Sequence, residues 1–230
     1  MVFCFATPSD FKTLAFEVRD YLKAHPNTAI VNLGCGLDNT GRSCDSGSCR
    51  ICNLDFPDVI AVQDQLLPAG EREENIPCDL NDCSWFEKID ASDGAVFFAA
   101  CEFYYFLTEQ VKALVQAMVK TFPDGRLVFD TAAIQDVGSY FSISDAKNEL
   151  SPQSRNLQIS SRGYMLGYQS LDYPSVSGFF RFLAKLGDRN MKMQIVRLDF
   201  SKEAVRWSIL LQQGATSKNT ERSVLLSNPG

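Results

Sequence analysis

The segment Thr28-Ala-Ile-Val-Asn-Leu-Gly-Cys-Gly36 decides the fold class of this chain. Its short β-branched and apolar start is typical of a buried parallel strand, and the two glycines end that strand in a turn. Glycine in such a turn lets the backbone come close to a ligand, and a helix that follows adds its positive end. We therefore expect a ligand site where this strand ends.

Strand and helix patterns alternate on either side of this segment. Helical spacing of apolar residues is found at 11–22, from Pro57 onward and after Thr108. The helix from Pro57 is expected to bury Val59, Val62, Leu66 and Leu67. Further strands are predicted at 50–54, 74–78, 94–100 and 126–130. Such alternation implies a doubly wound α/β fold, with a mostly parallel sheet, helices on both faces and a ligand beyond the carboxyl ends of the strands.

The pattern changes after Asp130. We expect a variable insert or lid at about 131–175, followed by a helix. The runs 191–200 and 204–211 are predicted to form an antiparallel hairpin at the sheet edge. Because 230 residues are few for two hydrophobic cores, the whole range 1–230 is expected to be a single domain.

Composition narrows the class of partner. Hydrophobic residues at 45% and charged residues at 22% are typical of a globular domain. A net charge of -6 disfavours nucleic acid and anionic membrane surfaces, and no apolar run is long enough for a membrane helix. The start of the sequence lacks the basic region of a signal peptide. We expect a cytoplasmic protein with a small-molecule partner, and the sequence leaves a homodimer open.

Eight cysteines and one histidine raise the question of a metal site. Cys44, Cys49 and Cys52, with Cys35 upstream, have enough thiols for zinc. Because Cys49 and Cys52 are three apart in a predicted strand, they point to opposite faces, which favours apolar packing, reduced thiols and no metal. The only histidine, His25, is expected at the surface far from the site, which disfavours a hydrolase triad.

Carboxylates follow three successive strands. Asp55 ends the second strand, where an acid can accept hydrogen bonds from ribose hydroxyls; the alternative is a cap for the next helix. Asp79 and Leu80 follow the third strand and suit an adenine ring, the alternative for Asp79 being a plain loop residue. Glu102 follows the fourth strand. Three acids at one sheet edge suit a cationic, hydroxyl-rich ligand better than a pyrophosphate.

Several motifs also stand in a characteristic order between about residues 28 and 130. They are Asn32-Leu-Gly-Cys-Gly-Leu-Asp38, Asp45-Ser-Gly47, Asn53-Leu-Asp-Phe-Pro-Asp-Val-Ile60, Trp85, Glu102 with Tyr105, and Phe122-Pro-Asp-Gly-Arg-Leu-Val-Phe-Asp130. This combination resembles the leucine carboxyl methyltransferase and polyketide-type O-methyltransferase family, whose members are class I S-adenosylmethionine-dependent enzymes.

The resemblance implies a Rossmann-like seven-stranded sheet with an antiparallel carboxyl-terminal hairpin, and S-adenosyl-L-methionine as cofactor. It implies methyl transfer to a carboxylate or hydroxyl of a small molecule, or to a protein carboxyl terminus. Glu102 and Tyr105 are candidates for positioning the acceptor. The implied cofactor-binding residues are Gly34, Cys35, Gly36, Leu54, Asp55, Asp79, Leu80 and Glu102.

The chain departs from the family pattern at its arginines. Two expected arginines fall on Thr40 and Ser43, with Arg42 between them, and a third falls on Gln63. These departures leave open a module that binds S-adenosylmethionine without turnover. A second alternative, an NAD(P)-dependent oxidoreductase, is disfavoured because Asn39 stands where the third glycine of the dinucleotide motif is expected.

Overall fold

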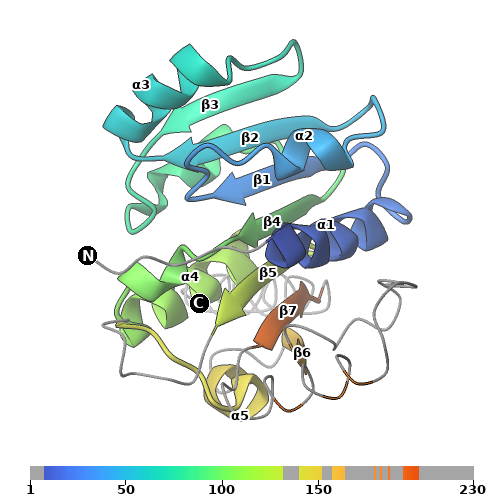
Figure 1. Cartoon of the computed structure of the whole chain (residues 1–230), viewed down its shortest axis with the longest axis vertical. Coiled ribbons are helices and arrows are strands. Elements are labelled where there is room, and N and C mark those ends of the chain that lie inside the picture. Colours follow the sequence, from blue (N-terminus) through green and yellow to red (C-terminus); the bar gives the residue numbers. More distant parts are fainter. Residues whose placement is uncertain are drawn as a thin grey trace, which may run out of the picture.

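The computed structural model describes residues 8–131, 140–151, 157–163 and 194–201, with the single positions 179, 182 and 186. Its centre is a seven-stranded sheet in the order β3-β2-β1-β4-β5-β7-β6 (Figure 1). The strands are β1 Ala29–Leu33, β2 Arg50–Asp55, β3 Glu73–Pro77, β4 Ala95–Ala99, β5 Arg126–Thr131, β6 Leu157–Gly163 and β7 Gln194–Phe200. The first five are parallel and the last two antiparallel, so the predicted doubly wound, mostly parallel sheet is confirmed.

Helices cover both faces of this sheet (Figure 1). They are α1 Pro8–Leu22, α2 Thr40–Cys44, α3 Pro57–Leu66, α4 Thr108–Thr121 and α5 Ala146–Leu150, with 3₁₀ turns η1 Cys83–Lys88 and η2 Phe103–Tyr105. Within the described residues, no helix is long and apolar enough to cross a membrane.

The central strands are buried on both sides, as parallel strands between helices must be. Side chains alternate along β1: Val31 and Leu33 join the cluster that α4 covers, whereas Ile30 joins the cluster under α1. On β4, Phe97 and Phe98 divide between the two clusters in the same way. This double burial fixes the register of β1 and β4, and with it the positions of the loops that follow them.

The antiparallel end of the sheet differs in part from the prediction. β7 lies in the predicted run 191–200, but it pairs with β6, at 157–163, within the segment predicted as an insert. This strand is an edge strand with exposed Gln158, Ser160 and Arg162, so it lacks the apolar pattern that marks the others. The predicted partner run 204–211 and most of the predicted helix after 175 lie outside the described residues.

The inward face of α3 also differs in part from the prediction, since Val59 and Leu67 are only half-buried. Ile60 and Gln63 are its buried residues, whereas Val62 is 48% and Leu66 62% exposed. The helix lies over β2 and the edge strand β3, so only a narrow stripe of it meets the sheet (Figure 1).

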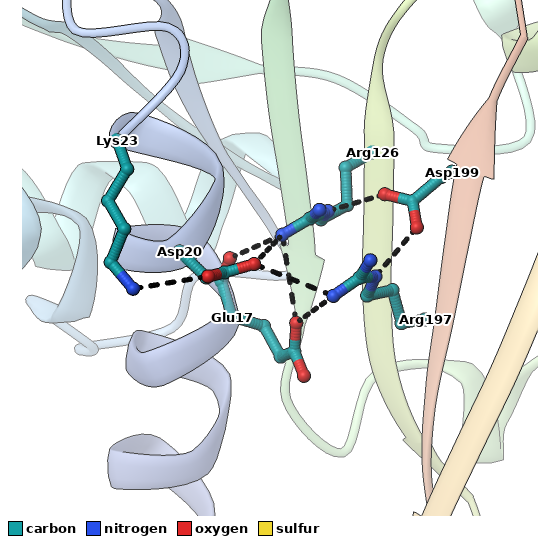
Figure 2. Close-up of polar contacts among 6 residues, drawn as sticks. All are labelled: Glu17, Asp20, Lys23, Arg126, Arg197 and Asp199. Atoms are coloured by element: carbon teal, nitrogen blue, oxygen red, sulfur yellow. Dashed lines mark hydrogen bonds and ion pairs between the residues drawn. The ribbon is translucent and has the colours of Figure 1, made fainter.

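A network of ion pairs joins α1 to β5 and β7 at the amino end of β5 (Figure 2). The Arg126 Nε atom lies 2.6 Å from Asp199, and its Nη1 atom lies 3.2 Å from Asp20. Glu17, only 1% exposed, contacts Arg197 at 3.1 Å. Because its members come from three elements, this network holds α1 against the sheet at the end away from the glycine turn.

Candidate functional site

The glycine turn after β1 is fixed to the end of β2. Both Gly34 and Gly36 are left-handed, with φ of +67° and +49°, a conformation that favours glycine. The N–H groups of Gly34 and Cys35 donate to the carbonyl oxygen of Leu54, at 2.9 and 3.0 Å. Leu54 therefore contacts the turn through its backbone carbonyl, while its side chain is buried in the core.

Asp55 joins the same turn from the end of β2. Its Oδ2 atom accepts the Gly36 N–H at 2.8 Å, and its Oδ1 atom accepts the Phe56 N–H at 2.7 Å. No side chain caps α3, so Asp55 is not the helix cap that was the alternative. The carboxylate is half-buried, and each of its oxygens has a second lone pair with which to accept a hydrogen bond from a ligand.

Glu102 lies directly over Gly34. A Cβ atom built on Gly34 would lie 2.1 Å from Glu102 Oε2 and 2.2 Å from Cδ, so only glycine leaves room for this carboxyl. Burial, and then the charge of Asp55, raise the pKa of Glu102 to about 7. Near neutral pH the group therefore changes readily between its neutral and ionised forms, and a nearby cation would favour the ionised one.

The remaining predicted residues lie at neighbouring strand ends. Asp79 is exposed and accepts hydrogen bonds from the backbone and side-chain nitrogens of Asn81, at 2.9 and 3.0 Å. Leu80 is 3% exposed, and its carbonyl accepts the Trp85 Nε1–H at 3.3 Å. Tyr105, on η2, is 55% exposed. The contacts described above join Gly34, Gly36, Asp55 and Glu102, while the roles of Asp79, Leu80 and Tyr105 stay predictions.

Two polar groups that the sequence does not predict as site residues support the turn, the half-buried Asp38 and the buried Gln63. Asp38 accepts hydrogen bonds from the Thr40 N–H and hydroxyl at 2.9 and 2.7 Å, and burial raises its pKa. Gln63 accepts the Cys35 thiol at 3.3 Å. Burial raises the pKa of Cys35 to about 12, so this residue offers a ligand its backbone rather than a thiolate. Asp38 belongs to the glycine motif, and this place in the sequence could have marked it as a site residue.

Asp130, at the end of β5, is a further unpredicted residue beside the site. It is 3% exposed and accepts the Cys101 N–H at 2.6 Å, one residue before Glu102. Only its place at a strand end, in the last position of a family motif, could have indicated it.

Arg42 lies between Thr40 and Ser43, the two positions where the family pattern has arginine, and its guanidinium binds residues away from the glycine turn. Its guanidinium pairs with Glu73 on β3 and donates to the Pro68 carbonyl at 2.9 Å. Thr40 is buried, and the Ser43 hydroxyl donates to the Thr40 carbonyl. A small polar pocket on this side is lined by Asp38, Asn39, Arg42, Asn53, Gln63, Leu67 and Glu73.

The cysteines and the histidine form no metal site among the described residues, where no three metal-ligating side chains gather. Six cysteines there are free thiols, including the buried Cys49 and Cys52. The expectation of reduced thiols is wrong for Cys101, which is disulfide-bonded. His25 is half-buried rather than fully exposed and stacks on Tyr21 with ring centroids 4.3 Å apart.

Comparison with known proteins confirms the resemblance predicted from the motifs. The model of the leucine carboxyl methyltransferase family matches residues 15–119. The tetracenomycin polyketide synthesis O-methyltransferase TcmP of Streptomyces glaucescens is 22% identical over 129 residues, which cover 53% of this chain and 48% of that protein. The chain thus spans about half the length of this curated relative.

Solved structures show the same fold. The N-methyltransferase NodS of Bradyrhizobium japonicum WM9 has a TM-score of 0.56 and 16% identity, covering 86% of this chain and 99% of its own. The plantazolicin methyltransferase BpumL, solved with a triazolic desmethylPZN analog and SAH, has a TM-score of 0.59 and 12% identity, covering 86% and 87%. The fold of this chain is therefore the Rossmann-like fold of class I methyltransferases.

Proposed function

We propose that this protein is an S-adenosylmethionine-dependent O-methyltransferase. The observation that carries the proposal is the packing of the Glu102 carboxyl on Gly34, in a turn whose next glycine is held by Asp55. Two carboxyl groups thus meet a bare backbone at the carboxyl ends of β1, β2 and β4, where sheets of this kind bind their ligands. The family match over residues 15–119 supports the same assignment.

The residues present fit this cofactor. S-adenosylmethionine has a sulfonium and an ammonium group, and two acids nearby suit its positive charge. A Cβ atom at Gly36 would meet no atom within 4 Å, so the turn has open space above it. In this proposal Gly34, Cys35 and Gly36 lie under the methionine part, and Asp55 receives the ribose hydroxyls. Asp79 and Leu80 border the adenine, and Leu54 holds the turn through its carbonyl.

When bound, the cofactor supplies a methyl group that its sulfonium already activates. The protein's residues must then place the acceptor oxygen in line with that methyl and exclude water. Tyr105 is exposed on η2, three residues after Glu102, and is the candidate for positioning the acceptor. A carboxylate acceptor arrives ionised and needs no base. For a hydroxyl acceptor, Glu102 has a pKa of about 7, in the range suited to proton transfer near neutral pH.

A second candidate function, a module of this fold that binds the cofactor without turnover, is favoured by one observation. Because Arg42 is engaged by Glu73, it does not offer its guanidinium to the carboxylate of the cofactor. Methyl transfer from labelled cofactor to carboxylate and hydroxyl acceptors separates the two candidates. Labelled ester or ether supports the enzyme, and cofactor binding without any transfer supports the module.

The experiment that tests the cofactor site compares two aspartates. Asp55→Ala removes a carboxylate expected to accept charge-assisted hydrogen bonds from the ribose, each worth about 1.5–3 kcal/mol, so S-adenosylmethionine affinity should fall roughly tenfold or more. Asp93→Ala makes the same change in an exposed residue before β4, at the opposite edge of the sheet, and should leave affinity unchanged. Equal affinity in both variants would remove Asp55 from the site.

A further inference from the structure

The chain between β4 and Glu102 passes through a strained residue. Cys101 has φ of +57°, the left-handed region, although it is not glycine. This conformation costs a residue with a side chain about 1–2 kcal/mol, and it persists only where the surrounding structure holds it. The residue that follows is Glu102, so the conformation of Cys101 sets the direction in which Glu102 leaves the strand.

Asp130 supplies a non-covalent contact that holds this turn, in addition to the disulfide of Cys101. Its buried carboxylate accepts the Cys101 N–H at 2.6 Å through Oδ1, and its Oδ2 lies 3.6 Å from the Cys101 sulfur. β4 and β5 are neighbours, with Ala99 opposite Phe129, so Asp130 stands one residue beyond the last pair. A hydrogen bond to a charged group contributes about 1.5–3 kcal/mol, enough to offset the left-handed backbone.

The chain is also fixed on the other side of Glu102. Phe103 is 1% exposed, and its ring lies 5.1 Å from that of Phe129 and 6.1 Å from that of Phe141. Glu102 therefore lies between a turn held by Asp130 and a ring anchored in the core. With both neighbours fixed, its carboxyl is directed onto Gly34.

We propose that Asp130 is the positioning residue of the methyltransferase site: through the Cys101 N–H it holds the Glu102 carboxyl over Gly34, beside the methionine end of the cofactor. This inference rests on the proposed function for its meaning, but the positioning itself can be measured without cofactor. The charged group that acts on Glu102 from β2 is Asp55, and its position does not depend on Asp130.

The experiment follows the protonation of Glu102. The free energy of unfolding is measured between pH 4 and 8 (roughly the span of the two pKa values) for each variant with and without Glu102→Gln. The difference within each pair reports the titration of Glu102 in the folded protein. In the native background it should change up to a pH of about 7. In Asp130→Ala, where the carboxyl is free to move into water, the change should end at least about one pH unit lower.

Matched variants separate positioning from a loss of stability. Asp130→Asn keeps an oxygen acceptor and should keep the native profile. Adding Cys101→Gly to Asp130→Ala should restore the native pH profile, since glycine adopts the left-handed turn freely. Adding Cys101→Ala instead removes the same sulfur but should not restore the profile. Thr131→Val changes the next buried residue and should move stability without moving the profile.

The proposal is overturned if Asp130→Ala keeps the native profile, if alanine at position 101 restores it as well as glycine does, or if the native protein shows no change up to pH 7. Should Asp130→Ala not fold, Asp130→Ser carries the same comparison, because its shorter side chain withdraws the acceptor from Cys101. Absence of S-adenosylmethionine binding by the native protein would refute the proposed function and leave this measurement unaffected.

Discussion

Replacing Gly34 by alanine tests the contact on which the site depends. The change acts in two ways: it places a side chain on a left-handed backbone, and it puts a Cβ atom 2.1 Å from the Glu102 carboxyl oxygen. Gly36→Ala is a matched control, because Gly36 is also left-handed and its Cβ atom would meet nothing within 4 Å. Any gain from reduced freedom of the unfolded chain is common to both variants and cancels.

The magnitudes follow from these two contributions. Left-handed strain should cost each variant about 1–2 kcal/mol in unfolding free energy. The overlap with Glu102 adds a cost to Gly34→Ala alone, because the carboxyl must move aside; since it is the end of a flexible side chain, this cost is at the low end for overpacking, about 1 kcal/mol. The expected total is therefore about 2–3 kcal/mol for Gly34→Ala and about 1–2 kcal/mol for Gly36→Ala.

Chemical denaturation of four proteins provides the assay: the native protein, Gly34→Ala, Glu102→Ala and the double variant. Removing the Glu102 side chain should recover the overlap contribution, so the double variant should be more stable than the sum of the single changes predicts. The same cycle with Gly36→Ala should be additive. Equal losses at the two glycines, or additivity in both cycles, would refute the packing of Glu102 on Gly34.

Three further predictions concern protonation, the ion network and the thiols. The pKa of Glu102 in the folded protein, about 7, exceeds the ordinary value of 4.5. The stabilising contribution of Glu102 to the free energy of unfolding is therefore complete below pH 4.5 and is lost as the pH rises to about 7. That loss, on the order of 3 kcal/mol, should be absent in Glu102→Gln when unfolding is followed against pH; a profile shared by both proteins would contradict the burial of this group. Glu17→Ala removes one carboxylate from the buried Arg126, which keeps Asp20 and Asp199, and should lower the free energy of unfolding by about 1–3 kcal/mol. A loss below about 0.5 kcal/mol in thermal or chemical unfolding would contradict this role of Glu17. Iodoacetamide mapped by mass spectrometry should modify the exposed Cys83 before the buried Cys35, whose pKa is about 12, and the reverse order would contradict the described turn.

The sequence predicts those parts of the fold that are buried on both faces. β4 is a continuous apolar run, and β1 is one apart from Asn32; both end in turns, and their places follow from pattern alone. Edge elements have a weaker pattern. β6 exposes polar residues on much of its length, and α3 turns Val62 and Leu66 to solvent, so apolar spacing did not reveal its buried face. The spacing of apolar residues shows which positions are chemically alike, but it does not show how wide a face of the helix packs on the sheet.

The candidate site also contains residues that the sequence predicts and one that it does not. Gly34, Gly36, Asp55 and Glu102 were predictable because each follows a strand and their strands are neighbours in the sheet. Asp130 was not, because its role depends on the conformation of Cys101 on the adjacent strand. A contact that depends on backbone torsion has no counterpart in spacing or composition.

The most direct test of the proposed cofactor site is calorimetric titration of the purified chain with S-adenosylmethionine and S-adenosylhomocysteine, with oxidised nicotinamide dinucleotide as control. We predict binding of both sulfur ligands with dissociation constants in the micromolar range, about -8 kcal/mol, and no binding of the dinucleotide. Binding of the dinucleotide, or of none of the three, would contradict the assignment of this sheet edge to S-adenosylmethionine.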